Sequence, residues 1–145
     1  MSVLKVNIYI YIRQKGKLQG MGSASALLEY ADSKGMVHTR TADVPEKDCT
    51  RNRIALEVTV MALKMLVKPC EVVIHTDNRY IKSCIANGWL EKWQQDGWVK
   101  PDGSAPANIN LWRDLCISSQ IHKIKFMPYK ERQEFKTIGK EGNHG

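Results

Sequence analysis

The chain has 145 residues, and its 43% hydrophobic and 26% charged residues are typical of one soluble globular domain. Its 22 Lys and Arg against 15 Asp and Glu give a net charge of +7, which favours a polyanionic partner such as nucleic acid. No apolar run approaches the roughly 20 residues of a membrane span, and the four cysteines form no CxxC pair. We therefore expect no membrane association, no zinc site, and reduced thiols in a cytoplasmic protein.

The first half of the chain predicts a three-strand antiparallel meander. Residues 3–13 alternate, with apolar side chains at positions 6, 8, 10 and 12 and polar or tyrosine side chains between them. Residues 22–31 and 36–42 are expected to be the next two strands, because Gly-containing turns precede both. We expect residues 43–50 to be a polar loop.

The second half predicts helices that alternate with buried strands. An apolar stripe indicates a helix over 51–67 that packs on the sheet, with Thr50 as its N-cap. The apolar run at 70–76 is typical of a strand buried on both faces, and the strand, helix, strand order implies a parallel neighbour. The remaining expected elements are helices at 78–87, 89–96 and 109–120, the last with Asn108 as a candidate cap, and a strand at 122–129. This order predicts an α/β fold, a mixed sheet with helices on its faces.

Four short motifs carry a resemblance to a known family. They are Thr50-x-Asn52-Arg53, His75-Thr76-Asp77-x-x-Tyr80, Trp89-x-x-x-Trp93-x-x-x-Gly97-Trp98 and Asn108-x-x-Leu111-Trp112. Together they resemble the type 1 ribonuclease H family. The resemblance implies a five-stranded mixed sheet flanked by helices, in which an antiparallel meander is followed by parallel strands. It also implies one domain over residues 1–130, with a basic Trp-rich handle at 88–108, and a C-terminal tail at 131–145.

The family cuts the RNA strand of RNA/DNA hybrids, and its four carboxylates hold two Mg²⁺ ions about 4 Å apart. Mg²⁺ takes oxygen ligands and dehydrates reluctantly, so several acids must converge. Of the four positions, the resemblance matches only Asp77 to an acid. Tyr11, Ala55 and Gly142 stand at the other three, and Arg132 stands where the family has a His. We therefore expect a degenerate site.

Two acids carry the hypothesis of a remaining metal site. Asp77 is either a ligand for Mg²⁺ or Mn²⁺ or only the N-cap of the helix that follows it. Glu57 is a weak substitute for the acid that the resemblance would place at Ala55. The two positions differ by roughly 200° around a helix, so their side chains point to nearly opposite sides. We also expect the Tyr11 ring to fill the vacated pocket and exclude the ions, since a phenol with a pKa of about 10 is a poor ligand at neutral pH.

The resemblance also indicates the residues that face nucleic acid: Thr50, Arg51, Asn52, Arg79, Lys92, Trp98 and Lys100. Lys92 and Lys100, with Arg113, Lys123 and Lys125, form either a phosphate-tracking band or a solvated basic surface. Trp98 is the best candidate for contact, and the other tryptophans are expected to pack the short helices. A hybrid duplex is near A-form, so recognition is expected through minor-groove 2′-hydroxyls and phosphates.

Three functions remain open. The first is a nucleic-acid-binding member of the family that recognises RNA/DNA hybrid or A-form duplex and lacks most of the metal-binding carboxylates. The second is an active ribonuclease H that needs Mg²⁺ or Mn²⁺ and cuts the RNA strand. The third is a non-catalytic protein-interaction module. None of the three needs a small-molecule cofactor, and whether the chain is an enzyme stays open at this point.

Overall fold

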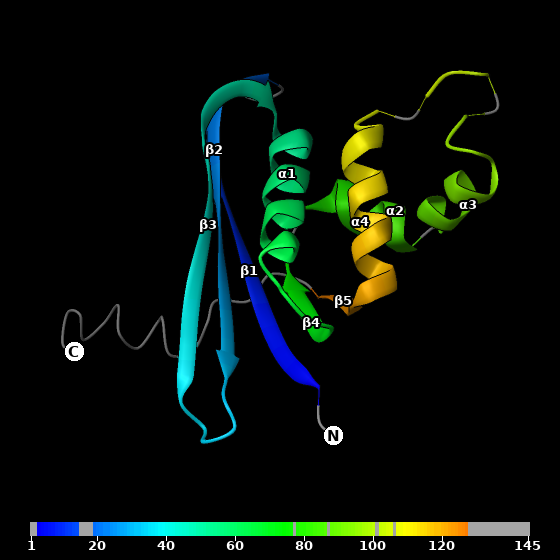
Figure 1. Ribbon diagram of the computed structural model, residues 1–145. Helices are drawn as coiled ribbons and strands as arrows, with labels where there is room; N and C mark the ends of the chain where they lie inside the picture. The colour runs from blue at the N-terminus through cyan, green and yellow to red at the C-terminus, as the bar shows by residue number, and fades with distance from the viewer. Residues whose placement is uncertain are drawn as a thin grey trace.

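The computed structural model describes residues 3–14, 19–76, 78–86, 88–100, 102–105 and 107–127 (Figure 1). The elements in chain order are β1 Leu4–Gln14, β2 Gln19–Ala31, β3 Val37–Thr50, α1 Arg51–Lys64, β4 Cys70–His75, α2 Arg79–Ala86, α3 Trp89–Gln95, α4 Ile109–Ile121 and β5 Lys123–Met127. None of the helices in the described part of the chain is long and apolar enough to cross a bilayer.

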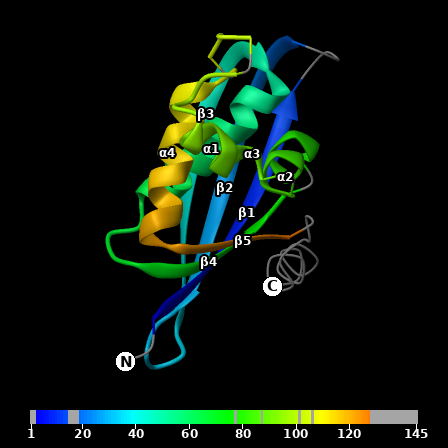
Figure 2. The ribbon, with the colours of Figure 1, turned by 90° about the vertical axis from the view of Figure 1, so that its right-hand side faces the viewer.

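The five strands form one sheet in the order β3-β2-β1-β4-β5. The central strand, β1, pairs antiparallel with β2 and parallel with β4. The parallel register runs from Leu4 opposite Cys70 to Tyr9 opposite His75. β5 adds to β4 in parallel, and Figure 2 shows these two strands side by side. The predicted α/β fold, with a meander followed by parallel strands, is confirmed.

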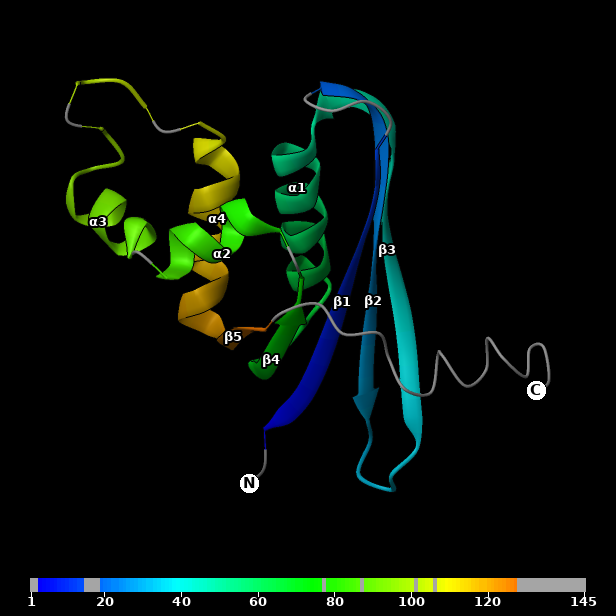
Figure 3. The same cartoon turned by 180° about the vertical axis from the view of Figure 1, so that it is seen from behind.

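The core lies between the sheet and α1. Val6 and Ile8 of β1 are at most 1% exposed, and Ile54 and Val58 of α1 are fully buried against them. Figures 1 and 3 show α1 between the sheet and α4. Burial of this kind is the main stabilising contribution, at roughly 25 cal/mol per Å² of apolar surface. The predicted apolar stripe is confirmed, except that Met61 is 38% exposed.

The opposite face of β1 carries polar and aromatic side chains. The Tyr9 ring stacks on His75 with 4.5 Å between ring centroids. His75 Nε2 lies 3.0 Å from Asn7 Oδ1, which fixes the imidazole across the β1–β4 pairing. The alternation predicted for the first strand therefore separates an apolar core face from a face that is only partly buried.

The prediction of a polar loop at 43–50 is wrong, because β3 continues to Thr50. Its pairing with β2 shifts register between Gly22 and Ala24, and this irregularity accommodates Pro45. β3 is an edge strand, so most of its polar side chains face solvent while Val44 stays buried. Polar composition alone therefore does not distinguish a loop from an edge strand.

The two predicted helix caps differ in outcome. Thr50 Oγ1 accepts a hydrogen bond from Arg53 N at 3.1 Å, so the N-cap of α1 is confirmed. Asn108 occupies the residue before α4, but with φ 60° its side chain makes no capping bond. Its Oδ1 instead accepts from Arg53 Nη1 at 3.1 Å and ties α4 to the start of α1. Asn108 is therefore the N-cap residue of α4, as predicted, but its side chain does not supply a capping hydrogen bond.

His122 joins the end of α4 to the start of β4. The ring is 5% exposed, and its Nδ1 accepts a hydrogen bond from Cys70 N at 3.1 Å. Burial lowers the pKa of His122 below its usual value, since the charged imidazolium is disfavoured away from water. The folded protein therefore holds this ring neutral.

This neutral histidine predicts a specific loss of stability in acid. The unfolded chain binds a proton at His122 near pH 6.5, whereas the folded protein resists it, so acidification favours unfolding. We expect the free energy of unfolding to fall as the pH drops from 7 to 5, and to fall less steeply in His122→Asn, whose amide oxygen can still accept from Cys70 N. Urea titrations at each pH measure this, and equal slopes in both proteins would contradict it.

Candidate nucleic-acid interface

An open pocket of about 410 Å³ lies where β1 and β4 end beside the start of α1. We call it the strand-end pocket; it is lined by Ile10, Tyr11, Ile12, Arg13, Arg51, Thr76 and Asn78. Parallel strands end at the same edge of a sheet, which is why the β1–β4 pairing gathers residues 66 positions apart in sequence, such as Ile10 and Thr76.

Tyr11 lies in the strand-end pocket, opposite Ser25 of β2, and its phenol oxygen is buried. Next to it, Arg13 Nη2 donates to Ser25 Oγ at 3.1 Å, and Ser25 Oγ donates to Asp43 Oδ1 at 2.7 Å. This chain of hydrogen bonds crosses three strands. It holds a guanidinium at the rim of the pocket, where a second one comes from Arg51.

Asn78 joins the starts of α1 and α2. Its Oδ1 accepts from Ile81 N at 2.9 Å, which caps α2, and its backbone N donates to Thr76 Oγ1 at 3.1 Å. Its Nδ2 donates to Asn52 Oδ1 at 3.3 Å. Asp77 lies outside the described residues, so its role as a metal ligand stays a prediction. The capping bond that we expected from Asp77 is made by Asn78.

Glu57 is not part of the strand-end pocket. Its Oε2 lies 2.6 Å from Lys47 Nζ, and its Oε1 lies 3.2 Å from Arg53 Nε. Ala55, on the other side of the apolar stripe, is fully buried. The structure therefore places Glu57 in an ion-pair cluster between α1 and β3, and does not bring it to the position vacated at Ala55.

The handle consists of α3 and the loop after it, which lie far from the sheet (Figure 1). Trp98 has φ 67°, and its backbone N donates to Trp93 O at 2.7 Å. The Arg113 guanidinium carbon lies 5.6 Å from the centroid of the Trp98 ring. Trp98 is partly buried, so one face of its ring is engaged by Arg113 within the protein.

A tyrosine–tryptophan contact fastens the handle to α2 and α4. Trp112 is fully buried, and its Nε1 donates to Tyr80 Oη at 2.8 Å. Tyr80 Oη donates in turn to Ala107 O at 3.4 Å, and the Trp93 ring packs 5.8 Å from the Trp112 ring. The packing role predicted for Trp93 and Trp112 is confirmed, while the side chain of Trp89 lies outside the described residues.

The predicted contact residues fall into two groups. Thr50, Arg51, Asn52 and Arg79 lie at the starts of α1 and α2, where only Arg51 of the four lines the strand-end pocket, and Lys92, Trp98 and Lys100 belong to the handle. Lys92 Nζ lies 3.4 Å from Asp96 Oδ2, and Lys100 is exposed.

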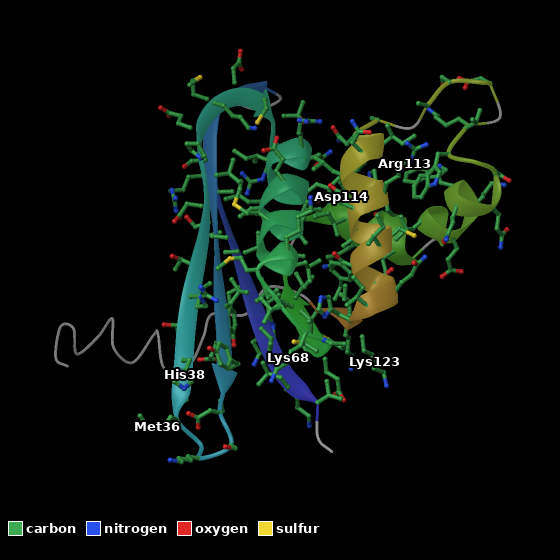
Figure 4. All side chains as sticks on the ribbon, viewed as in Figure 1. Met36, His38, Lys68, Arg113, Asp114 and Lys123 are labelled. Carbon is green, nitrogen blue, oxygen red and sulfur yellow. The ribbon has the colours of Figure 1, made fainter. Side chains whose placement is uncertain are left out.

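The basic band does not continue onto β5. Lys123 and Lys125 lie on this edge strand beyond the C-terminal end of α4, whereas Arg113 lies near its N-terminal end (Figure 4). No role was predicted for Arg13 or Asn78 from the sequence. The only signals for them were their positions, Arg13 just before the turn that follows β1 and Asn78 just before α2.

The described lining of the strand-end pocket does not fit a two-ion centre. It offers a phenol, a hydroxyl, an amide and two guanidinium groups, and a divalent cation is disfavoured beside two fixed positive charges. No cluster of three or more His, Cys, Asp or Glu suited to a metal occurs in the described part of the chain. The same lining is chemically suited to an anion such as a phosphate.

The bond network of Asn78 predicts a measurable effect on stability. Asn78→Ala removes the cap of α2 and is expected to lower the free energy of unfolding by about 1 kcal/mol. Asn78→Ser keeps a capping oxygen and serves as the matched control, with a loss of at most about half of that. Urea unfolding measures both variants. Equal losses would mean that the cap is not what Asn78 contributes.

Comparisons with known proteins agree with this geometry. The RNase H family model matches residues 13–130. Relatives named Ribonuclease H from Acetivibrio thermocellus and Lachnoclostridium phytofermentans are 36% and 31% identical over 126 and 123 residues. These matches cover 87% and 85% of this chain, and 82% and 78% of the two relatives.

Solved structures show the same fold. LC9-RNase H1, a type 1 RNase H with the type 2 active-site motif, aligns with a TM-score of 0.71 at 25% identity, over 92% of this chain and 66% of that one. The foamy viral protease-reverse transcriptase in complex with RNA/DNA hybrid has a TM-score of 0.63 at 13% identity, over 94% of this chain and 18% of that one, which shows the fold alone. By the family model and by its relatives, this chain belongs to the RNase H family.

Proposed function

We propose that this chain binds RNA/DNA hybrid, or another A-form duplex, through the strand-end pocket and the handle, without a two-ion catalytic centre. The observation that carries the proposal is the pair of guanidinium groups, Arg13 and Arg51, at the rim of a pocket in which Tyr11 stands at an acid position of the family. In the family this place holds cations that meet a phosphate. Here arginine side chains supply that positive charge.

The chemistry of the surrounding residues supports the same ligand. Arginine binds phosphate oxygens in a bidentate manner, and the exposed Arg79 adds a further charge at the start of α2. Asn52, also exposed, offers polar groups for 2′-hydroxyls, the feature that separates an A-form minor groove from B-form DNA. Lys92 and Lys100 of the handle extend the contact along the backbone. A fold neighbour solved with RNA/DNA hybrid, the foamy viral enzyme, is consistent with this ligand.

The alternative is an active ribonuclease H. Its support is the name of the relatives, and its requirement is a metal site that includes Asp77 and acids outside the described residues. Two Mg²⁺ or Mn²⁺ ions bound there would supply charge neutralisation and an activated water. Glu57 does not contribute to such a site while it is paired with Lys47 and Arg53.

A cytoplasmic location fits this proposal. Cys49, Cys70, Cys84 and Cys116 are buried, and burial raises the pKa of the Cys84 thiol to about 11. Such thiols resist oxidation but are most compatible with a reducing compartment.

Binding is expected to persist without divalent ions and to depend strongly on salt. In a mobility-shift assay with RNA/DNA hybrid and EDTA, the logarithm of the affinity should fall linearly with the logarithm of salt concentration. Arg51→Gln should weaken binding and reduce the magnitude of this slope by about 1, and Arg13→Gln should act similarly. Arg40→Gln, which removes the same charge from β3 at the other end of the sheet, is the control. Equal weakening by all three variants would reject the strand-end pocket as the contact.

Cleavage is the decisive test between the two functions. We expect no cut RNA when an end-labelled hybrid is incubated with Mg²⁺ or Mn²⁺ and the chain at a concentration that retards the hybrid fully. Cleavage by the parent that disappears in Asp77→Asn would establish the active enzyme instead.

A further inference from the structure

We propose that a groove at the opposite end of the sheet from the strand-end pocket binds an acidic peptide segment with apolar side chains. This groove, which we call the α1–β4 groove, has a volume of about 750 Å³ and lies under the connection from α1 to β4. Its floor is apolar and includes Leu4, Leu28, Met65 and Leu66. The proposal does not depend on the proposed nucleic-acid function.

Apolar side chains also stand exposed at the edge of the groove. Val67 is 94% exposed, and Val3 on the other side is 44% exposed. Beyond Val67 a second hollow of about 410 Å³ is bordered by Ile117 and Ile121, which are 56% and 52% exposed. Val67 is therefore a ridge between two hollows, and an extended segment laid across it would cover apolar surface on both sides.

The charges around the α1–β4 groove select an acidic partner. Lys5, Arg40 and Lys68 line it and are exposed, and none of them forms an ion pair with another described residue. Figure 4 shows Lys68 at the same end of the molecule as Met36 and His38, with Arg113 near the other end. Unpaired cations beside exposed apolar side chains match carboxylates beside apolar anchors.

Asp32 also lines the groove, and its one negative charge offsets only one of the three positive charges of Lys5, Arg40 and Lys68. Asp32 Oδ1 accepts from Lys34 N and Met36 N at 2.8 and 2.9 Å, and its Oδ2 lies 2.8 Å from His38 Nε2. The bond from His38 is the main reason why the pKa of Asp32 is lowered. This carboxylate is engaged within the β2–β3 turn.

Glu71 of β4 also lies at this end of the sheet. Its partners in the strand register are Lys5 of β1 and Lys123 of β5, so its one negative charge offsets the positive charge of only one of these two lysines. Arg40 and Lys68 keep a net positive charge at the groove.

Other occupants fit less well. A nucleic acid backbone would leave Val67 and Ile117 in contact with water or with phosphates. A second copy of this chain would bring a net charge of +7 against a basic groove. The chain's own residues 128–145 carry four basic and three acidic side chains, so they lack the required negative charge.

Fluorescence anisotropy with three labelled peptides tests the proposal on the full chain. The first peptide has four aspartates followed by two leucines and a phenylalanine, the second replaces the apolar residues by serine, and the third replaces the aspartates by serine. We expect the first to bind at least about tenfold more tightly than either of the others, because both kinds of contact are needed.

Substitutions then locate the contact. Val67→Asp places a charge on an exposed ridge without affecting the core, and should weaken binding by at least about tenfold. Arg40→Gln and Lys68→Gln should each weaken it about two- to fivefold. Arg51→Gln, with the same loss of charge at the other end, is the matched control and should leave it unchanged.

The proposal is overturned by equal binding of the first and second peptides, by equal weakening in Arg51→Gln and Arg40→Gln, or by unchanged binding in Val67→Asp. Self-association that Val67→Asp abolishes, measured by sedimentation without peptide, would assign the ridge to a second copy and would also reject it.

Discussion

The parallel pairing of β1 with β4 is the constraint on which the rest of the structure depends. It places the meander and the helical half of the chain in one sheet, and its register, from Leu4 opposite Cys70 to Tyr9 opposite His75, sets where both strands end. The crossover between the meander and β4 contains α1, whose buried face covers β1 and β2. The strand-end pocket and the α1–β4 groove are the two ends of this one packing unit.

The sequence predicted the elements whose signal is local and periodic. The alternation of residues 3–13 and the apolar stripe after Thr50 gave β1 and α1, and the capping hydroxyl of Thr50 marked the start of the helix to the residue. β3 was predicted too short because its second half is polar, and its strand conformation comes from pairing with β2 at the sheet edge. That pairing is a contact between distant residues, which a local pattern does not contain.

The site was predictable to the extent that its residues sit at element boundaries. Arg51 and Asn52 lie in the first turn of α1 and Arg79 begins α2, and Arg51 lines the strand-end pocket, while the contact of all three with nucleic acid stays a prediction from the resemblance. Asn108 was correctly placed at the N-cap of α4, but its side chain accepts a hydrogen bond from Arg53 instead of capping the helix, and a local pattern does not contain that tertiary contact. The partners of Glu57 were equally hidden, because Lys47 lies on the segment that was expected to be a loop.

A pocket that has Tyr11 at an acid position of the family and two arginines at its rim differs in its chemistry from a carboxylate cluster. A carboxylate cluster repels phosphate until metal ions neutralise it, and so it couples binding to metal. A rim made by Arg13 and Arg51 attracts phosphate directly, and the buried Tyr11 oxygen occupies space beside it. Since Arg13 is held by Ser25, which is bonded to Asp43, the charge is positioned before any ligand arrives. Under the function proposed above, such a pocket retains a duplex and does not hydrolyse it.

Separation of the two surfaces has a consequence for how they work together. α1 has 14 residues and so spans about 20 Å between the strand-end pocket at its start and the α1–β4 groove at its end. This distance exceeds the screening length of about 8 Å at physiological salt, so charges at one end act weakly on a ligand at the other. A peptide in the groove and a duplex at the pocket therefore do not compete for the same cations. If both proposals hold, we expect the two ligands to bind at once, with α1 and the sheet as the connection between them.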